Sequence, residues 1–167
     1  MSRLFVCLWP PDHVVTSLEE LHRKDQVGAR FVMPENWHVT LRFLGNADPN
    51  DVAAALSTAT FEPTTVRLGP AVDIGNERTL FVPAAGADAL AAEVVDATGS
   101  LGDEKIRSRF LGHITIARIK KRANMPRVLG ELIDAEWEPS TVALVESTLH
   151  ADGARYDTLQ TWPIPAR

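Results

Sequence analysis

The sequence is poor in cysteine and has no long apolar segment. Cys7 is the single cysteine among 167 residues, so no disulfide can form within the chain, which favours a cytoplasmic location. No apolar run approaches the ~18 residues needed to cross a membrane, and the run at 4–9 is too short for a signal peptide. We therefore expect a cytoplasmic protein without a membrane span, in which Cys7 is a buried, inert thiol.

Positive charge is also scarce, except in one stretch. The formal net charge is −5, which disfavours bulk nucleic-acid binding. Residues 105–127 nevertheless contain eight basic residues and no acidic one, which leaves a balance of −13 for the rest of the chain. A stretch of this kind is either a solvated face or a binding site for phosphate-bearing ligands.

Several common catalytic signatures are missing. The chain has no Gly-rich phosphate loop, no Gly-x-Ser-x-Gly elbow and no dinucleotide-binding fingerprint. It also lacks a His-Glu-x-x-His motif or paired aspartates beside its most notable histidines, and threonine is a poor zinc ligand. A metal site is the main competing use of two histidines, and this composition disfavours it, so no metal or other cofactor is predicted.

Two short runs carry the chemistry that is present. His38-Val39-Thr40-Leu41 and His113-Ile114-Thr115-Ile116 share the pattern His-x-Thr-x with large apolar residues at x. Side chains alternate between the two faces of a β-strand, so each run sets an imidazole and a hydroxyl on one face and anchors the other face in a core. Two such strands across a cleft would offer both pairs to one ligand.

The two runs belong to a longer near-repeat. Leu4-Phe5-Val6 recurs as Leu80-Phe81-Val82, and a helix and a His-x-Thr strand follow each copy at nearly the same spacing. Such a repeat predicts two similar lobes related by an approximate two-fold axis, with equivalent His strands facing one another. With no linker between the halves, residues 1–167 are expected to form one bilobal α+β domain, which we expect to be a monomer.

Periodicity and turn residues predict the remaining elements. Strands are expected at 4–9, 80–82, 140–149 and 155–162, and extended segments at 30–32 and 64–74. Helices are expected at 12–24, from Asp48-Pro49 to Ala59, at 86–98, and from Asn124 or Pro126 to Leu132.

A pair of imidazoles suits phosphoester cleavage. With an ordinary pKa near 6.5, one imidazole can be neutral and the other protonated at neutral pH, so the pair can supply a general base and a general acid. Thr40 and Thr115 are suitable donors to phosphate oxygens, and a guanidinium can neutralise developing charge. Strict alternation places Arg42 on the His face and Arg118 on the opposite face, unless the second strand twists, so either arginine remains a candidate.

At this point the chain resembles a known family. Paired His-x-Thr-x motifs in a small two-lobed chain look like the two-histidine (2H) phosphoesterase superfamily and, within it, the RNA 2′,3′-cyclic phosphodiesterases, also called 2′-5′ RNA ligases. The matching residues include Arg3-Leu4-Phe5-Val6, Pro34-Glu35-Asn36-Trp37, the two runs extended to Gly45 and Arg118, and the closing Ser147-Thr148-Leu149. The chain departs at Gly112, where members often have proline, and we expect this glycine to loosen the start of the second His strand.

The resemblance implies a fold and a reaction. It implies two lobes of antiparallel sheet with outer helices around a central cleft, and metal-independent hydrolysis of RNA 2′,3′-cyclic phosphate termini to a 2′-phosphate. His113 would activate water, and His38 would protonate the leaving 3′ oxygen, whereas by residue chemistry alone the two are interchangeable. Thr40, Thr115 and Arg118 would hold the phosphate, with Arg42 as the alternative.

The resemblance also names partners and leaves other functions open. The reverse reaction would join RNA ends through a 2′-5′ linkage. The basic stretch at 105–127 would follow the RNA backbone. Phe43 or Tyr156 would stack on a base, although core packing is the simpler role for Phe43. Two other functions stay open: a 2H enzyme for another cyclic phosphate or small nucleotide, and a non-catalytic RNA or nucleotide-binding module.

Overall fold

The structure, a computed structural model, describes residues 2–167. Ten strands and three α-helices occur in these residues, together with two short 3₁₀ turns. In chain order they are β1 (Ser2–Leu8), α1 (Asp12–Glu19), β2 (Ala29–Phe31), η1 (Pro34–Asn36), β3 (Val39–Ala47), α2 (Pro49–Leu56), β4 (Val66–Leu68), β5 (Asp73–Ile74), η2 (Asn76–Arg78), β6 (Thr79–Ala85), α3 (Asp88–Thr98), β7 (His113–Ile119), β8 (Ala135–Trp137), β9 (Thr141–His150) and β10 (Gly153–Pro163).

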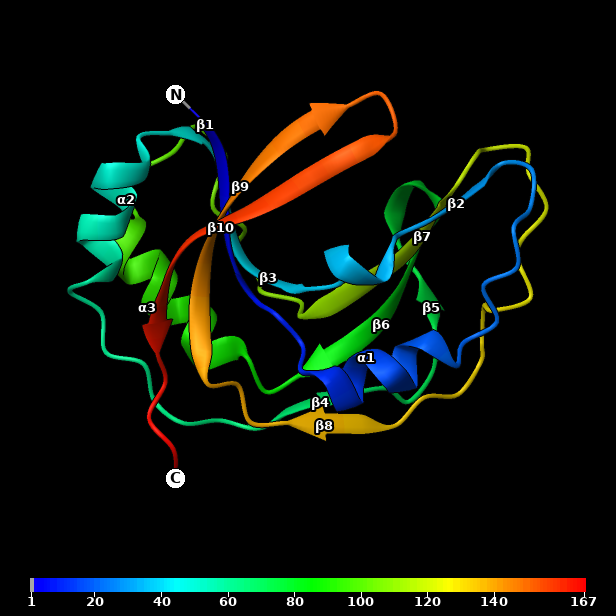
Figure 1. Cartoon of the computed structure of the whole chain (residues 1–167), viewed down its shortest axis with the longest axis horizontal. Coiled ribbons are helices and arrows are strands. Elements are labelled where there is room, and N and C mark those ends of the chain that lie inside the picture. The colour runs from blue at the N-terminus through cyan, green and yellow to red at the C-terminus, as the bar shows by residue number, and fades with distance from the viewer. Residues whose placement is uncertain (1) are drawn as a thin grey trace.

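The strands form a curled antiparallel sheet with the order β10-β9-β1-β3-β7-β6-β4-β8. Figure 1 shows β1 and β3 near the middle, with β9 and β10 on one side and β6 and β7 on the other. The strands of the two sequence halves meet where β3 pairs with β7 through Val39 and Ile114. This arrangement confirms the predicted α+β class with antiparallel strands and outer helices.

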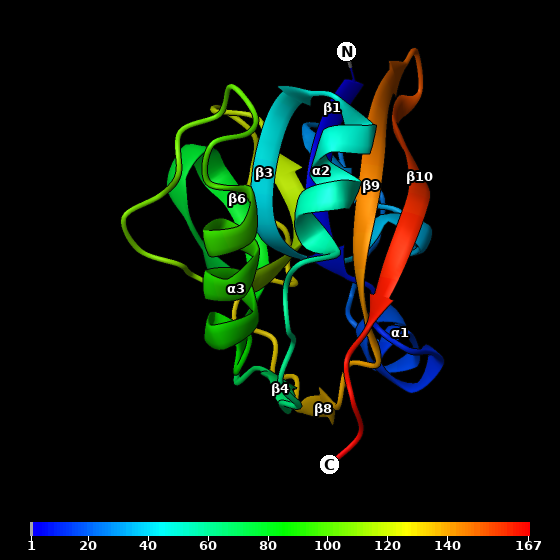
Figure 2. The same cartoon turned by 90° about the vertical axis from the view of Figure 1, so that its left-hand side faces the viewer.

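The helices pack across the two halves. Figure 2 shows α2 in front of β1 and α3 lower down, in front of β6. Helix α3, which belongs to the second half, contacts α2 and β3 of the first half. Conversely, α1 of the first half lies against β8 of the second half. Each helix buries an apolar stripe, such as Val14 with Leu18 in α1 and Leu90 with Val94 in α3. These contacts between the helices of one half and the strands of the other hold the two halves together.

Strand β1 separates two apolar clusters. Leu4, Val6 and Leu8 point into the main core, while the alternate residues Phe5 and Cys7 face the other side of the sheet. There they pack with Ala143 and Val145 in a small cluster beneath the candidate site described below. Cys7 is fully buried and unpaired, and burial raises the pKa of its thiol, as expected for an inert side chain.

Two helix predictions need correction. The predicted helix at 12–24 ends at Glu19, because the backbone N–H of His22 donates to the Glu131 carboxylate at 3.1 Å instead of continuing the helical ladder. The predicted helix from Asn124 or Pro126 to Leu132 is wrong. Its apolar spacing is helix-like, but Gly130 has a φ of +86° and its N–H donates to the carbonyl of Val72 at 2.9 Å, so the segment pairs with residues 70–72.

The structural repeat differs in register from the sequence repeat. Cys7 pairs with Thr40 in the first half, and Phe81 pairs with Thr115 in the second half. The structural equivalent of Phe81 is therefore Cys7, two residues beyond the Phe5 that the repeated Leu-Phe-Val predicted. The approximate two-fold arrangement of the His strands holds, but the Leu-Phe-Val match does not mark equivalent positions.

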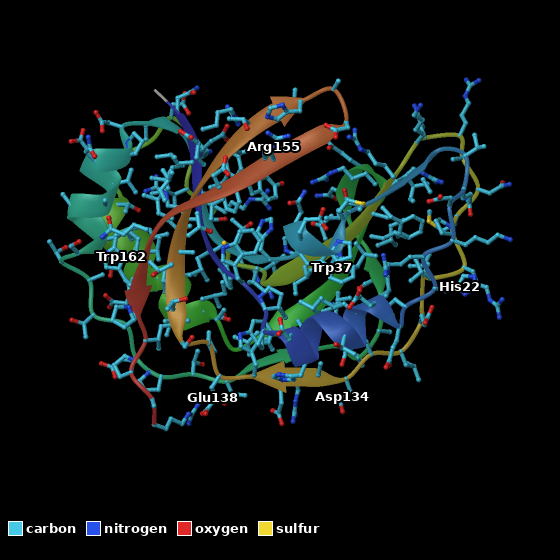
Figure 3. The ribbon with its side chains drawn as sticks, viewed as in Figure 1. His22, Trp37, Asp134, Glu138, Arg155 and Trp162 are labelled. Atoms are coloured by element: carbon cyan, nitrogen blue, oxygen red, sulfur yellow. The ribbon has the colours of Figure 1, made fainter. Side chains whose placement is uncertain are left out.

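Membrane-spanning helices are not found among the described residues. Figure 3 shows His22 at the periphery, whereas Trp37 lies near the middle of the molecule, where it is buried.

Candidate active site

The two His-x-Thr runs meet at the junction of the halves. His38 directly precedes β3, His113 begins β7, and the intervening apolar residues Val39 and Ile114 are paired and fully buried. Because neighbouring residues in a strand point to opposite faces, the His and Thr residues on either side face away from the core. Continuing the antiparallel register sets His38 across from Thr115 and Thr40 across from His113.

The four side chains line one cleft of about 620 Å³. Its lining also includes aromatic, basic and polar side chains, among them Phe5, Asn36, Phe43, Lys105, Arg107, Phe110, Ser147 and Tyr156. The cleft thus brings together His38, Thr40, His113, Thr115 and Arg118, and Arg42 also borders it.

Both imidazoles are oriented in the same way. Nδ1 of His38 lies 2.7 Å from the carbonyl oxygen of Asn36, and Nδ1 of His113 lies 2.8 Å from that of Leu111. A carbonyl only accepts, so in each ring Nδ1 carries the proton and donates it. In the neutral tautomer Nε2 is then the unprotonated nitrogen and is left for the ligand.

His38 sits among aromatic rings. Phe5 stacks on it with ring centroids 4.8 Å apart, and Tyr156 and Trp9 meet it edge-on at 5.4 and 5.5 Å. This burial lowers the pKa of His38 to about 4, and the nearby charge of His113 adds to the shift, against the opposing hydrogen bond to Asn36. His38 is therefore neutral at pH 7 in the unliganded protein.

Arg118 reaches the cleft because β7 contains a β-bulge. Phe81 pairs with Thr115 and Leu80 with Ala117, so Ile116 is an extra residue in the ladder. The bulge reverses the alternation, buries Ala117 and turns Arg118 to the face of His113 and Thr115, where it lines the cleft. Strict alternation had placed Arg118 on the opposite face, and the bulge is the local irregularity that overturns it.

Arg42 is displaced by the equivalent irregularity in β3. Cys7 pairs with Thr40 and Val6 with Arg42, so Leu41 is the extra residue, and Arg42 leaves the His face that strict alternation predicted. Its side chain is only 6% exposed and donates to the carbonyls of Thr98 and Leu101, the latter at 2.8 Å, at the end of α3. These bonds occupy its terminal nitrogens, although the residue borders the inner wall of the cleft.

The same bulge brings Phe43 to the cleft. Phe43 is 41% exposed, stacks on Phe5 at 6.1 Å and has the guanidinium of Arg3 over its ring at 5.4 Å. The simpler expectation of core packing is therefore wrong for Phe43, and Tyr156 also lines the cleft. Only the position of the bulge, which the sequence does not mark, exposes this ring.

The basic stretch splits into two groups. Three of its residues, Lys105, Arg107 and Arg118, line the cleft. The other five are exposed and lie outside the lining: Arg109, Lys120, Lys121, Arg122 and Arg127. Fewer than half of these charges therefore face the cleft. Among residues 2–167 no group of three or more His, Cys, Asp or Glu side chains is arranged to hold a metal ion.

Gly112 does not loosen the start of β7. Its carbonyl accepts from the backbone N–H of Ala84 at 2.9 Å, and a Cβ at this position would lie 2.3 Å from the Ala84 carbonyl oxygen. The glycine therefore permits a close backbone approach that extends the β6–β7 pairing beyond His113 to Gly112.

The two imidazoles lie opposite each other, each is followed two residues later by a threonine, and the guanidinium of Arg118 lines the same cleft. This arrangement defines a phosphoesterase cleft of the two-histidine type. Comparison with known proteins agrees. Residues 8–75 match the family model described as LigT-like phosphoesterase. The RNA 2′,3′-cyclic phosphodiesterase of Aeropyrum pernix is 30% identical over 80% of this chain and 85% of that protein. The RNA 2′,3′-cyclic phosphodiesterase of Methanocaldococcus jannaschii is 24% identical over 96% of this chain and 99% of that protein.

The fold comparison points the same way. The crystal structure of TT0787 of Thermus thermophilus superimposes with a TM-score of 0.79 and 28% identity over 97% of both chains. The chain therefore belongs to the LigT-like phosphoesterases, a family of phosphodiesterase hydrolases.

Proposed function

We propose that this protein hydrolyses RNA 2′,3′-cyclic phosphate ends to 2′-phosphates with two imidazoles as acid and base and without a metal ion. The observation that carries the proposal is that His38 and His113, each with Nδ1 bonded to a carbonyl, share one cleft with Thr40, Thr115 and Arg118. The names of the archaeal relatives support the choice of substrate.

The reaction is an in-line displacement at phosphorus. Nε2 of one imidazole takes a proton from water as the water oxygen bonds to phosphorus. The bond from phosphorus to the ribose 3′ oxygen breaks, and Nε2–H of the other imidazole protonates that oxygen, which leaves a 2′-phosphate and a 3′-hydroxyl. The hydroxyls of Thr40 and Thr115 donate to the non-bridging oxygens, and Arg118 offsets their charge.

We assign His113 as the base and His38 as the acid. Burial keeps His38 neutral in the unliganded protein, so its acid role requires that the bound phosphate anion raise its pKa. The cleft favours this change, because a bound anion lies beside His38 and stabilises its protonated form, while His113 as the base carries no charge. With the 5′-hydroxyl of a second RNA in place of water, the same displacement would join two RNA ends through a 2′-5′ linkage, and the ribose 3′ oxygen would again be the leaving group.

The aromatic wall supports a nucleotide as the ligand. Phe43 is exposed beside the cleft, and Tyr156 and Phe5 surround His38, so a base has apolar surface to stack on next to the phosphate site. A second candidate within the same enzyme class is hydrolysis of another cyclic phosphate. We expect the protein to act as a monomer in the cytoplasm.

The test is hydrolysis of an RNA oligomer ending in a 2′,3′-cyclic phosphate, with EDTA present, from about pH 5 to about pH 9. We expect a bell-shaped rate profile and a 2′-phosphate product, and a loss of about 10²–10⁴-fold in kcat for His38→Ala or His113→Ala. A 3′-phosphate product, or turnover that EDTA abolishes, would contradict the mechanism.

Competing functions give different outcomes in the same assay. A non-catalytic binding module would bind the RNA without turnover, and the two alanine variants would retain most of the affinity. An enzyme for another cyclic phosphate would hydrolyse cyclic dinucleotides or small cyclic esters in preference to the RNA end, and 2′-AMP would compete poorly.

A further inference from the structure

The cleft does not end at the histidines. Beyond Thr40 it continues along β3 toward α3, and the connection between α3 and β7, residues 99–112, forms its outer wall. Figure 2 shows this connection arching away from the sheet on the side where α3 lies. We call residues 103–111 of this connection the arm.

The base of the arm is fastened to the first His strand. Both side-chain oxygens of Asp103 accept from Asn46, at 2.8 Å from its backbone N–H and 3.0 Å from its side-chain amide. The backbone N–H groups of Asp103 and Glu104 both donate to the carbonyl of Leu44, at 3.0 and 3.1 Å. The residues just before the arm are also fixed, because the guanidinium of Arg42 donates to the carbonyl of Leu101 at 2.8 Å.

The far end of the arm is fastened to β6, since the carbonyl of Gly112, the residue before His113, accepts from the backbone N–H of Ala84 at 2.9 Å. The arm is therefore held at one end by β3, which His38 directly precedes, and at the other by β6, which pairs with β7 and its His113. Its position relative to the reacting groups is set by the fold rather than by the ligand, which reduces the entropy lost on binding.

The space between the arm and α3 is mainly apolar. On the helix side it is lined by small side chains, Ala91, Ala92 and Val95, and on the arm side by Ile106, Phe110 and Leu111, of which Leu111 is 62% exposed. An exposed apolar wall next to a polar phosphate site is the environment that a nucleobase requires.

Two cations on the arm lie along this space. Lys105 and Arg107 are exposed, line the cleft and form no ion pair within residues 2–167. The acidic side chains at this end are Asp88 and Asp96 of α3 and Glu104, which pairs with Arg3 at 3.6 Å. Lys105 and Arg107 are thus the free positive charges next to the apolar space.

We propose that the arm binds the nucleotide that precedes the cyclic end of an RNA, with Lys105 and Arg107 on its phosphodiester and its base between Ile106, Leu111 and α3. This inference rests on the proposed function. A terminal ribose held at the histidines is joined through its 5′ oxygen to the next phosphate, which is the nearest further anion in the substrate. A mononucleoside cyclic phosphate has no such group and leaves the arm unused, so the protein prefers oligonucleotide ends.

The test compares a nucleoside 2′,3′-cyclic phosphate with the dinucleotide that ends in the same group. We expect a higher kcat/KM for the dinucleotide, mainly through a lower KM. Lys105→Ala/Arg107→Ala lowers kcat/KM for the dinucleotide by about tenfold or more, and for the mononucleoside by less than about twofold. Salt weakens the dinucleotide preference, because phosphate contacts release counterions.

Lys120→Ala/Lys121→Ala is the matched control, since it removes two charges of the same basic stretch that lie outside the cleft. We expect this control variant to leave kcat/KM unchanged for both substrates. Equal kcat/KM for the two substrates, or an equal loss for both in the arm variant, overturns the inference while leaving the proposed function intact. Failure to hydrolyse either substrate overturns the proposed function itself.

Discussion

Val39 and Ile114 form the backbone pair through which the two halves of the sheet meet, and both side chains are fully buried. The pair sets the distance between the two catalytic candidates that precede them, His38 and His113. A core contact therefore positions the polar groups on the opposite face of the same two strands.

The first prediction concerns stability at low pH. The pKa of His38 is about 4 in the folded protein against an ordinary value of 6.5. At pH values between these two the unfolded chain binds more protons than the folded protein, so the free energy of unfolding decreases as the pH falls. The contribution of the neutral His38 to this free energy is complete above pH 6.5 and is lost as the pH falls toward 4. The loss is at most about 3.5 kcal/mol, since one pKa unit corresponds to about 1.4 kcal/mol.

Urea unfolding between these pH values measures this effect. His38→Gln should flatten the decline in the free energy of unfolding, and the exposed His150→Gln is the control for removing one imidazole. An unchanged decline in His38→Gln would show that burial does not keep His38 neutral.

The second prediction separates acid from base. Replacing the bridging 3′ oxygen of the cyclic phosphate by sulfur creates a leaving group that needs no proton. If His38 is the acid, His38→Ala recovers most of its lost rate on the sulfur substrate and His113→Ala does not. Recovery by His113→Ala instead would exchange the two roles and leave the two-imidazole mechanism standing.

The third prediction concerns Arg118. Its guanidinium lines the cleft and its contact to the Thr79 hydroxyl, at 3.4 Å, is long, so it is free to bind phosphate. Arg118→Ala should lower kcat/KM by about 10²-fold with little change in stability, and Arg118→Lys should restore part of the activity. The exposed Arg122→Ala is the control. Wild-type activity in Arg118→Ala would remove this residue from the site.

The fourth prediction assigns Arg42 a positioning role. Arg42→Met removes a donor from the carbonyl of Leu101, and it removes one of the two donors of the Thr98 carbonyl, which keeps the backbone N–H of Leu101. The free energy of unfolding should therefore fall by about 1–3 kcal/mol. Amide hydrogen exchange should rise in residues 99–112, and KM for the dinucleotide should increase more than kcat falls.

Arg67→Met is the control for Arg42→Met, because Arg67 forms an exposed pair with Glu136 at 3.4 Å and such pairs contribute little. Arg42→Met with unchanged exchange but a large loss of kcat would instead indicate direct contact with the reacting phosphate.

Local patterns in the sequence were sufficient for several features. The two His-x-Thr runs, with apolar residues between and after them, specify strands with one polar and one buried face, because alternation is a property of the extended backbone. Asp48-Pro49 likewise specifies a helix start, and the Asp48 side chain accepts from the N–H of Asn50 at 2.8 Å. The histidines and threonines of the site were predictable for this reason.

The tertiary structure alone decided which arginine enters the cleft. Leu41 and Ile116 are the extra residues of two β-bulges, and each bulge reverses the alternation of the residues after it. Nothing in the residue types marks these positions, since a bulge arises from how neighbouring strands pair. The bulges exchange the expected positions of Arg42 and Arg118 and expose Phe43. The arm likewise meets the site only through contacts between residues distant in the sequence, such as Asp103 with Asn46.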